Sequence, residues 1–304
     1  MPLVRKTRIL IGLSMLTPSE EATRIARPYA HVRRGFIERP STKGRVSPES
    51  DPLEIRTPLE NLMSRYDASG GGGAGGYLRI ALLLSISWVQ SKPPYSSPRV
   101  PSWWAMLLQL PDPMNTGARA VRDTLTELER RNFIEISPID GSKNLITLLD
   151  ERGNGDAYTY PDGSPGQLYV RVPRALWANG WISQMSGRAL AVYLAVLSNS
   201  GWRDKPFWIS GPTFRERYGM SDSTRKKGLA ELVELGVLQV VAKSVAAQNG
   251  TRTFRRNVYT LTPELQSLTR EPTSKTAPAT PTAEDPSAEA SPLRTLPNSE
   301  EGSL

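Results

Sequence analysis

Basic and hydroxyl side chains gather at the start of one predicted helix, within the stretch 220–240, MSDSTRKKGLAELVELGVLQV. Apolar residues from Leu229 onward recur at the three-to-four spacing of an amphipathic helix, which leaves Ser223, Lys226 and Lys227 on the opposite side. A solvent-facing side that carries cations and a hydroxyl can bind phosphate oxygens and donate hydrogen bonds to base edges. This stretch is therefore a candidate nucleic-acid contact.

The ends of this helix are marked in the sequence. Ser221 is suited to cap the N-terminus, Gly236 stands where a helix stops in a left-handed conformation, and 237–240 continues as a short apolar strand. Thr224 joins Ser221 at the N-terminus, where unbonded N–H groups and the helix dipole favour phosphate. Arg225 falls at the margin of the packed face, so we expect it to reach a phosphate or a carboxylate rather than a base.

This order of helix, glycine and strand resembles the recognition helix and first wing strand of winged helix-turn-helix DNA-binding domains. The matching residues are Ser223, Thr224, Lys226, Lys227, Leu229, Glu231, Leu232 and Gly236. The resemblance implies that Ser223, Lys226 and Lys227 face the bases of double-stranded DNA. It further implies backbone and wing contacts from Arg215, Arg217, Lys243, Arg252, Arg255 and Arg256. The alternative is that these charges form an ordinary solvated surface.

The elements around this stretch give a second module, residues 167–266. Periodicity predicts a strand at 168–172, a short helical connector from 173 to 182, helices at 186–200 and 212–218, and strands at 207–209 and 253–261. The segment 242–252 is expected to be the wing loop. Helix, strand, helix, helix and hairpin is winged-helix order.

A first module, residues 77–150, repeats that order. It has expected helices at 77–88, 102–110 and 115–131 and a hairpin of strands 133–136 and 144–149. Residues 127–128 align with 231–232, and 133–136 with 237–240, at the same offset, so we interpret the modules as two divergent copies. The residues comparable to the DNA-facing set are Asn115, Arg119, Arg122 and Asp123. DNA contact through Arg119 and Arg122, and a homodimer formed through the first module, both stay open.

Composition limits the chemistry of the chain. The 304 residues include no cysteine, which excludes disulfides and cysteine-ligated zinc, and one histidine, His31. No paired carboxylates or metal signature stand out, so we expect no enzyme, cofactor or metal. The net charge of +8 is concentrated in 167–266, with 14 Lys/Arg against 6 Asp/Glu. A basic excess of this kind favours a polyanionic partner.

The remaining segments are expected to lie outside the packed modules. Residues 1–76 are interpreted as a flexible basic arm with a Gly-rich linker, 151–166 as a linker, and 267–304 as a disordered acidic Pro/Ser/Thr/Ala tail. Arg33 and Arg34 in the arm could contact phosphate, and a translation start further along, for example at Met63, is a further reading. No apolar run has the length of a membrane span, and we expect a cytoplasmic protein.

The sequence thus predicts a mainly α fold with small β-hairpins (α+β), built from two winged-helix modules. The expected function is double-stranded DNA binding, either as a transcriptional regulator or as a replication initiator that recruits host proteins. A tandem pair of modules is similar to two-winged-helix plasmid replication initiators. The alternative is a non-enzymatic protein-interaction scaffold that uses winged helices for pairing. We expect core packing, rather than stacking on nucleic acid, for a set of tryptophans: Trp103, Trp104, Trp177, Trp181 and Trp208.

Overall fold

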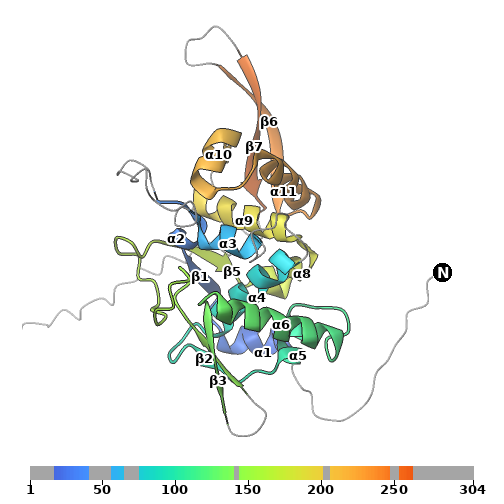
Figure 1. The fold of residues 1–304 in the computed structure, drawn as a ribbon. Helices are drawn as coiled ribbons and strands as arrows, with labels where there is room; N and C mark the ends of the chain where they lie inside the picture. Colours follow the sequence, from blue (N-terminus) through green and yellow to red (C-terminus); the bar gives the residue numbers. More distant parts are fainter. Residues whose placement is uncertain are drawn as a thin grey trace, which may run out of the picture. The chain divides into compact units, whose positions relative to one another are not determined.

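The computed structural model describes residues 17–40, 56–64, 75–139, 144–200, 206–246 and 253–262. These residues form a mixed α+β fold in which helices predominate and the strands form small antiparallel sheets (Figure 1). The predicted fold class is confirmed. The acidic tail expected at 267–304 lies outside the described residues.

The first module contains three helices and a small sheet in the order expected from its sequence. Its elements are α4 (Gly75–Val89), β2 (Ser96–Ser97), α5 (Pro101–Leu107), α6 (Thr116–Arg130), β3 (Ile134–Pro138) and β4 (Asn144–Leu148). The strands pair antiparallel in the order β2-β4-β3, with Ser97 opposite Ile146 and Ile134 opposite Leu148.

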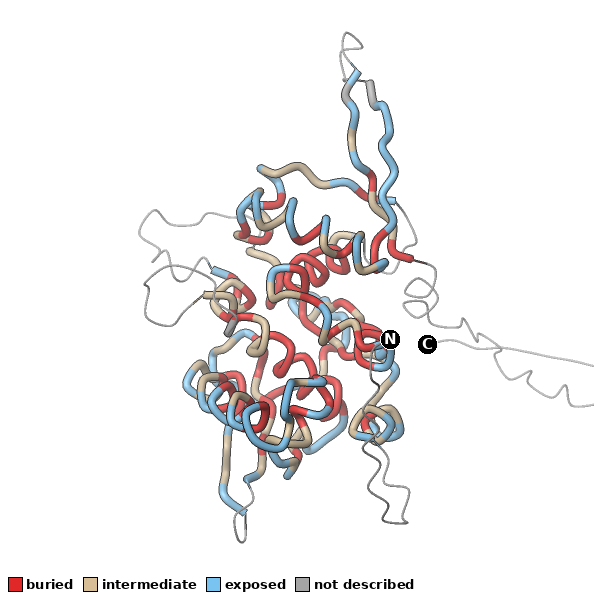
Figure 2. Tube along the Cα trace, turned by 90° about the vertical axis from the view of Figure 1, so that its right-hand side faces the viewer, coloured by how far each residue is buried: buried red, intermediate tan, exposed pale blue. Residues whose placement is uncertain are grey.

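The second module has the same succession of elements. They are α9 (Gly187–Ser200), α10 (Gly211–Tyr218), α11 (Asp222–Glu234), β6 (Leu238–Ala246) and β7 (Thr253–Leu261). The strand predicted at 207–209 is reduced to one bridge, from Phe207 to Tyr259 of β7. The β6–β7 hairpin extends beyond the helices in Figure 1, and Figure 2 shows that its outer part is exposed while its base is buried.

The two modules repeat the same backbone geometry after their third helices. The Phe133 N–H donates to the Leu128 carbonyl at 3.0 Å, and the Val237 N–H donates to the Leu232 carbonyl at 2.9 Å. The residue before each donor is left-handed, with φ of 60° at Asn132 and 74° at Gly236. All three pairs of positions have the offset found in the sequence. The main difference is hairpin length, since each strand has 5 residues in the first module and 9 in the second.

The N-terminal arm is folded where the structure describes it, which corrects the expectation of a flexible segment. It contains α1 (Pro18–Ile25), β1 (Tyr29–Arg33), α2 (Arg34–Ile37) and α3 (Pro58–Met63). β1 pairs antiparallel with β5 (Tyr169–Pro173), whose chain continues into α7 (Ala175–Ala178) and α8 (Trp181–Gln184). Local signals for α1 and α3 are present, because Thr17 and Thr57 begin capping boxes with Glu20 and Glu60. The β1–β5 pairing joins residues far apart in sequence, so no local pattern reveals it.

Arg33 and Arg34 also differ from their expected role as phosphate contacts. Arg33 is 1% exposed, and its guanidinium bonds to Glu151, to Thr159 and to the Gln167 side chain, the last at 2.6 Å. Arg34 donates to the Ser198 carbonyl at 3.0 Å. Arg33 therefore fastens β1 to the segment expected to be a linker, 151–166, and it has no surface for a phosphate.

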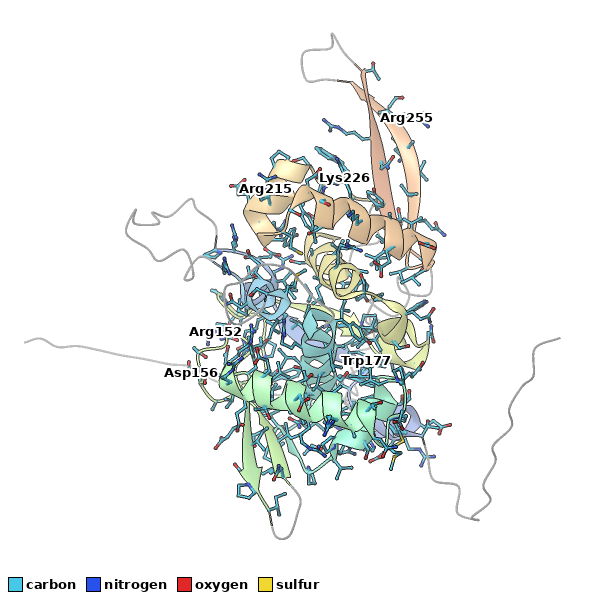
Figure 3. All side chains as sticks on the ribbon, turned by 45° about the vertical axis from the view of Figure 1, so that its right-hand side comes forward. Arg152, Asp156, Trp177, Arg215, Lys226 and Arg255 are labelled. Atoms are coloured by element: carbon cyan, nitrogen blue, oxygen red, sulfur yellow. The ribbon has the colours of Figure 1, made fainter. Side chains whose placement is uncertain are left out.

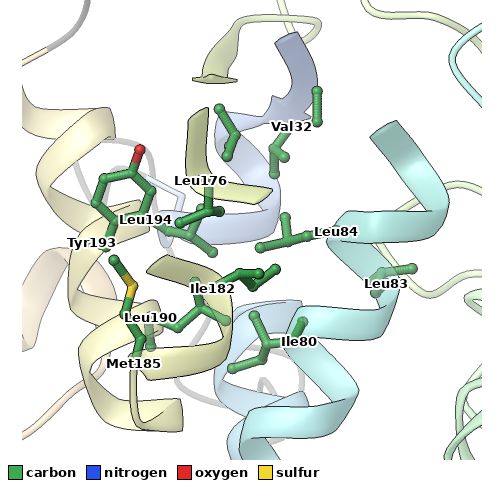
Figure 4. Close-up of a cluster of buried hydrophobic side chains, with 14 of the residues drawn as sticks. Val32, Ile80, Leu83, Leu84, Leu176, Ile182, Met185, Leu190, Tyr193 and Leu194 are labelled. Atoms are coloured by element: carbon green, nitrogen blue, oxygen red, sulfur yellow. The ribbon is translucent and has the colours of Figure 1, made fainter. Parts of the chain in front are cut away.

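The described residues of the two modules and of the N-terminal segment share one hydrophobic core. By their contacts, the described residues also belong to one compact unit. The cause is α4, an almost entirely apolar helix that packs against both α6 and α9. Figure 4 shows its Ile80 and Leu84 directed toward the α9 side chains Leu190 and Leu194 across the α7–α8 segment. The two modules are therefore joined through a common core.

Candidate nucleic-acid interface

Helix α11 carries the central part of the candidate interface. Ser221 caps it by accepting a hydrogen bond from the Thr224 N–H at 3.1 Å. Leu229 and Leu232 are buried against the core, whereas Ser223, Lys226 and Lys227 are exposed along the outer side. The two hydroxyls of the cap, Ser221 Oγ and Thr224 Oγ1, lie 2.9 Å apart. The amphipathic pattern read from the sequence therefore gives the expected outer face.

The position of α11 depends on a close approach to α9. A Cβ added to Gly228 would lie 2.5 Å from Val192 Cγ2 and 3.3 Å from the Arg188 carbonyl oxygen. One turn further on, the Glu231 carboxylate accepts hydrogen bonds from the Ser186 N–H and hydroxyl at 2.6 and 2.7 Å. Glu231 thus caps the N-terminus of α9 and holds α11 against it. Although Glu231 is among the residues that match a recognition helix, its contact is with α9 and not with a ligand at the outer face.

Asp222 organises the first turn of α11. Arg225 donates to the Asp222 carboxylate at 2.7 and 2.9 Å and to the Ile209 carbonyl at 3.2 Å, and its side chain is 14% exposed. Lys226 Nζ lies 2.9 Å from the other Asp222 oxygen, but its side chain is 70% exposed. Hydrogen bonds from Lys226 and Arg225 hold the pKa of the Asp222 carboxyl below its usual value. Arg225 therefore has the carboxylate contact expected for it, and Lys226 extends to solvent.

The two arginines of α10 have different surroundings. Arg215 is exposed on the outer side of the helix. Arg217 donates to Glu38 at 2.9 Å and to the Asn199 side chain at 3.3 Å, so it ties α10 to the N-terminal segment and to α9. Of the two, Arg215 is the one placed for a ligand at the surface, and Arg217 has a structural contact that the sequence did not reveal.

The hairpin adds basic residues on both of its faces. Lys243 on β6 is exposed and pairs in register with Arg256 on β7, while the exposed Arg255 lies opposite Ser244. The Arg256 guanidinium carbon lies 4.0 Å from the centroid of the Trp208 ring, a cation–π contact. Arg252, the remaining wing residue of the prediction, lies outside the described residues.

Trp208 is the one expected core tryptophan that the structure places largely outside. Its exposed fraction is 47%, whereas Trp104 and Trp177 are at most 1% exposed, as expected of core residues. Trp103 and Trp181 are half-buried against the core. The bridge to Tyr259 holds Phe207 with its side chain inward, so the side chain of its neighbour Trp208 points outward. Strict alternation along a short strand was the signal that could have identified it.

The exposed cations of α10, α11 and the β6–β7 hairpin lie at one end of the described fold. Figure 3 labels Arg215 on α10, Lys226 on α11 and Arg255 on β7 at this end, beyond the shared core. Lys227 and Lys243 belong to the same helix and hairpin. The structure therefore brings together three elements that the sequence analysis selected separately.

The first module offers fewer cations at the comparable place. Arg119 and Arg122 are exposed on α6, next to the exposed Asp123. Near the end of α6, Glu127 pairs with Arg130 and Arg131, and Arg131 also donates to the Asn61 carbonyl of α3. Since its hairpin is shorter and has no Lys or Arg in either described strand, α6 provides most of the charge on this face.

Comparison with protein-family models, curated proteins and solved structures gives no match for this chain. Within the described ranges, no group of three or more His, Asp or Glu side chains is placed to hold a metal ion. The helices of the described part are also too short or too polar to cross a membrane.

Proposed function

We propose that the chain binds double-stranded DNA through the second module, with the outer side of α11 in the major groove and the β6–β7 hairpin against the adjacent backbone. The observation that carries the proposal is the set of exposed cations that converge on one end of the fold from three elements: Arg215, Lys226, Lys227, Lys243 and Arg255. A surface of this kind attracts a polyanion and can follow the repeated phosphates of a duplex.

Two acids of α11 are already engaged by other side chains. Asp222 is already paired with Arg225 and Lys226, and Glu231 bonds to Ser186 on the packed side of α11. Asp222 is the only acid in the first turn of α11. Ser223 and Lys227 lie on the outer side of the same helix. The N-terminal part of α11 therefore keeps its basic character where it faces solvent.

The order of elements supports a winged-helix interpretation of both modules. In each, three helices with one bridging strand between the first two are followed by an antiparallel hairpin. A protein with two such modules suits either transcriptional regulation or the initiation of replication on plasmid DNA, where host replication or transcription proteins would be recruited. If the chain does not bind duplex DNA, the alternative is a non-enzymatic protein-interaction scaffold that uses the winged-helix modules for pairing.

Two matched double variants test which module contacts DNA. Lys226→Ala with Lys227→Ala removes two exposed cations from α11, and Arg119→Ala with Arg122→Ala removes two from α6. Loss of two phosphate contacts lowers the magnitude of the log–log salt slope of duplex binding by about 2. We expect that change for the α11 pair and little change for the α6 pair, measured by fluorescence anisotropy with random-sequence duplex. Equal losses would contradict the assignment to the second module.

A further inference from the structure

The edge of β6 that faces away from β7 presents unpaired backbone groups. In the described part of the chain β6 pairs with β7 alone. The Thr262 N–H donates to the Val237 carbonyl at 3.2 Å, and Tyr259, opposite Val240, exchanges hydrogen bonds with Phe207 on the other side of β7. Because successive residues of a strand direct their N–H and C=O to alternate edges, Val240, and with it Ala242 and Ser244, direct these groups outward.

The corresponding edge in the first module is blocked. The outward N–H of Ile136 donates to the Glu129 carboxylate at 2.9 Å, and Pro138, two residues further, has no N–H. At the offset that relates the modules, these positions are Val240 in place of Ile136, Val233 in place of Glu129 and Ala242 in place of Pro138. Both devices that protect the first edge are therefore missing from the second.

The side chains along β6 also leave apolar surface uncovered. Val240 is 40% exposed and Val241 is 57% exposed, on opposite faces of the strand. A long, exposed and partly apolar edge strand is a template for pairing with another strand. We propose that β6 pairs antiparallel with β6 of a second copy of this chain, which forms a dimer through a continuous four-stranded sheet.

The sequence of β6 is complementary to itself in this arrangement. A two-fold axis at Ala242 pairs the whole strand, because Leu238 then lies opposite Ala246 of the second copy. Outward-directed residues meet outward-directed residues, as hydrogen bonding requires. Lys243 lies opposite Val241 of the second copy, so no like charges stand directly opposite one another. An axis at Lys243 would set the two lysines face to face, and the axis at Ala242 avoids that repulsion.

A proline at the two-fold axis tests the hydrogen bonding. Ala242→Pro removes an outward N–H at both sides of the axis, as Pro138 does in the first module, and leaves the bonds between β6 and β7 in place. Ala242→Ser is the matched control, since it changes the side chain and keeps the N–H. Sedimentation velocity of the full chain over a concentration series should show a wild-type dimer, an Ala242→Ser variant with the same dissociation constant, and an Ala242→Pro dissociation constant raised at least about tenfold.

Two charge variants test the register without changing the backbone. Val241→Lys sets a lysine opposite Lys243 of the second copy twice per dimer, and Val241→Glu sets an acid there instead. Two cross-strand charge pairs change the dissociation constant by about 2- to 30-fold, upward for Val241→Lys and downward for Val241→Glu. These variants carry the test if Ala242→Pro fails to fold.

Several outcomes would overturn the proposal. A wild-type chain that stays monomeric at several hundred micromolar would do so, as would a dimer indifferent to all three variants. Slow hydrogen exchange at the Val240 and Ala242 amides of a monomer would show that a segment of the same chain covers the edge. The dimer is measured without DNA, so failure to bind duplex leaves this result unaffected.

Discussion

Gly228 offers a quantitative test of how α11 is positioned. Its place in the helix gives alanine an intrinsic advantage of about 1 kcal/mol over glycine. Against this, the added Cβ would lie 2.5 Å from Val192 Cγ2 and 2.9 Å from Val192 Cβ, and both atoms belong to a β-branched side chain with little rotamer freedom. Overpacking of this kind costs about 1–3 kcal/mol. We therefore expect Gly228→Ala to lower the free energy of unfolding by roughly 1 kcal/mol.

Gly35 provides the matched control. It is also helical, but unlike Gly228 it is exposed, and a Cβ added there meets no atom within 4 Å. Gly35→Ala should therefore leave stability unchanged or raise it by up to about 1 kcal/mol. Both variants are compared with the parent by urea denaturation, and a third variant, Val192→Ala with Gly228→Ala, should show that the Gly228 penalty shrinks when Val192 is shortened. A Gly228→Ala protein as stabilised as Gly35→Ala would refute the close α9–α11 contact.

Three further predictions concern His31 and Arg33 of the N-terminal segment and the exposed Trp208. Burial, and then the nearby charges of Arg171 and Arg27, lower the pKa of His31 from 6.5 to about 3, so between these values the unfolded chain binds a proton that the folded chain does not. Stability should therefore fall as pH drops below about 6.5, by up to about 1.4 kcal/mol per pH unit, and this slope should be absent between pH 6.5 and 5 in His31→Gln. Glu151→Ala removes the nearer of the two carboxylates that pair with the buried Arg33, so it should lower the free energy of unfolding by about 3–5 kcal/mol in urea denaturation, and a loss below about 1 kcal/mol would contradict this role of Glu151. Trp208→Phe should remove the tryptophan emission that is most accessible to a soluble quencher among the described residues, and an unchanged quenching curve would place the ring inside the core.

The local elements could be predicted because their signals are short-range. Ser221 and Gly236 bound α11 as the sequence indicated, and α4 is buried over most of its length because its apolar residues leave no continuous polar stripe. The outer side of α11, with Lys226 and Lys227, followed from the spacing of Leu229 and Leu232. Periodicity and capping therefore supplied the helix and its exposed residues.

The contacts that join distant segments could not be predicted in this way. Proline and scattered arginine made 17–40 resemble an unpacked arm, yet β1 completes a sheet with β5 and Arg33 binds Glu151. In a single sequence both members of such a contact are present, but nothing in the local pattern of either one indicates that they meet. The same limit applies to Arg217, whose bond to Glu38 turned an expected surface cation into a structural one. In these cases the charge of an arginine is paired with a carboxylate that lies far away in the chain.

The most direct test of the account is the salt dependence of duplex binding by the full chain. If the five exposed cations of the candidate interface (Arg215, Lys226, Lys227, Lys243 and Arg255) each neutralise one phosphate, the logarithm of the binding constant should fall against the logarithm of salt concentration with a slope of about −4.5. Fluorescence anisotropy with a labelled random-sequence duplex measures this slope between 50 and 300 mM salt. An affinity that does not change with salt, or no binding at the lowest salt, would contradict DNA binding through this surface.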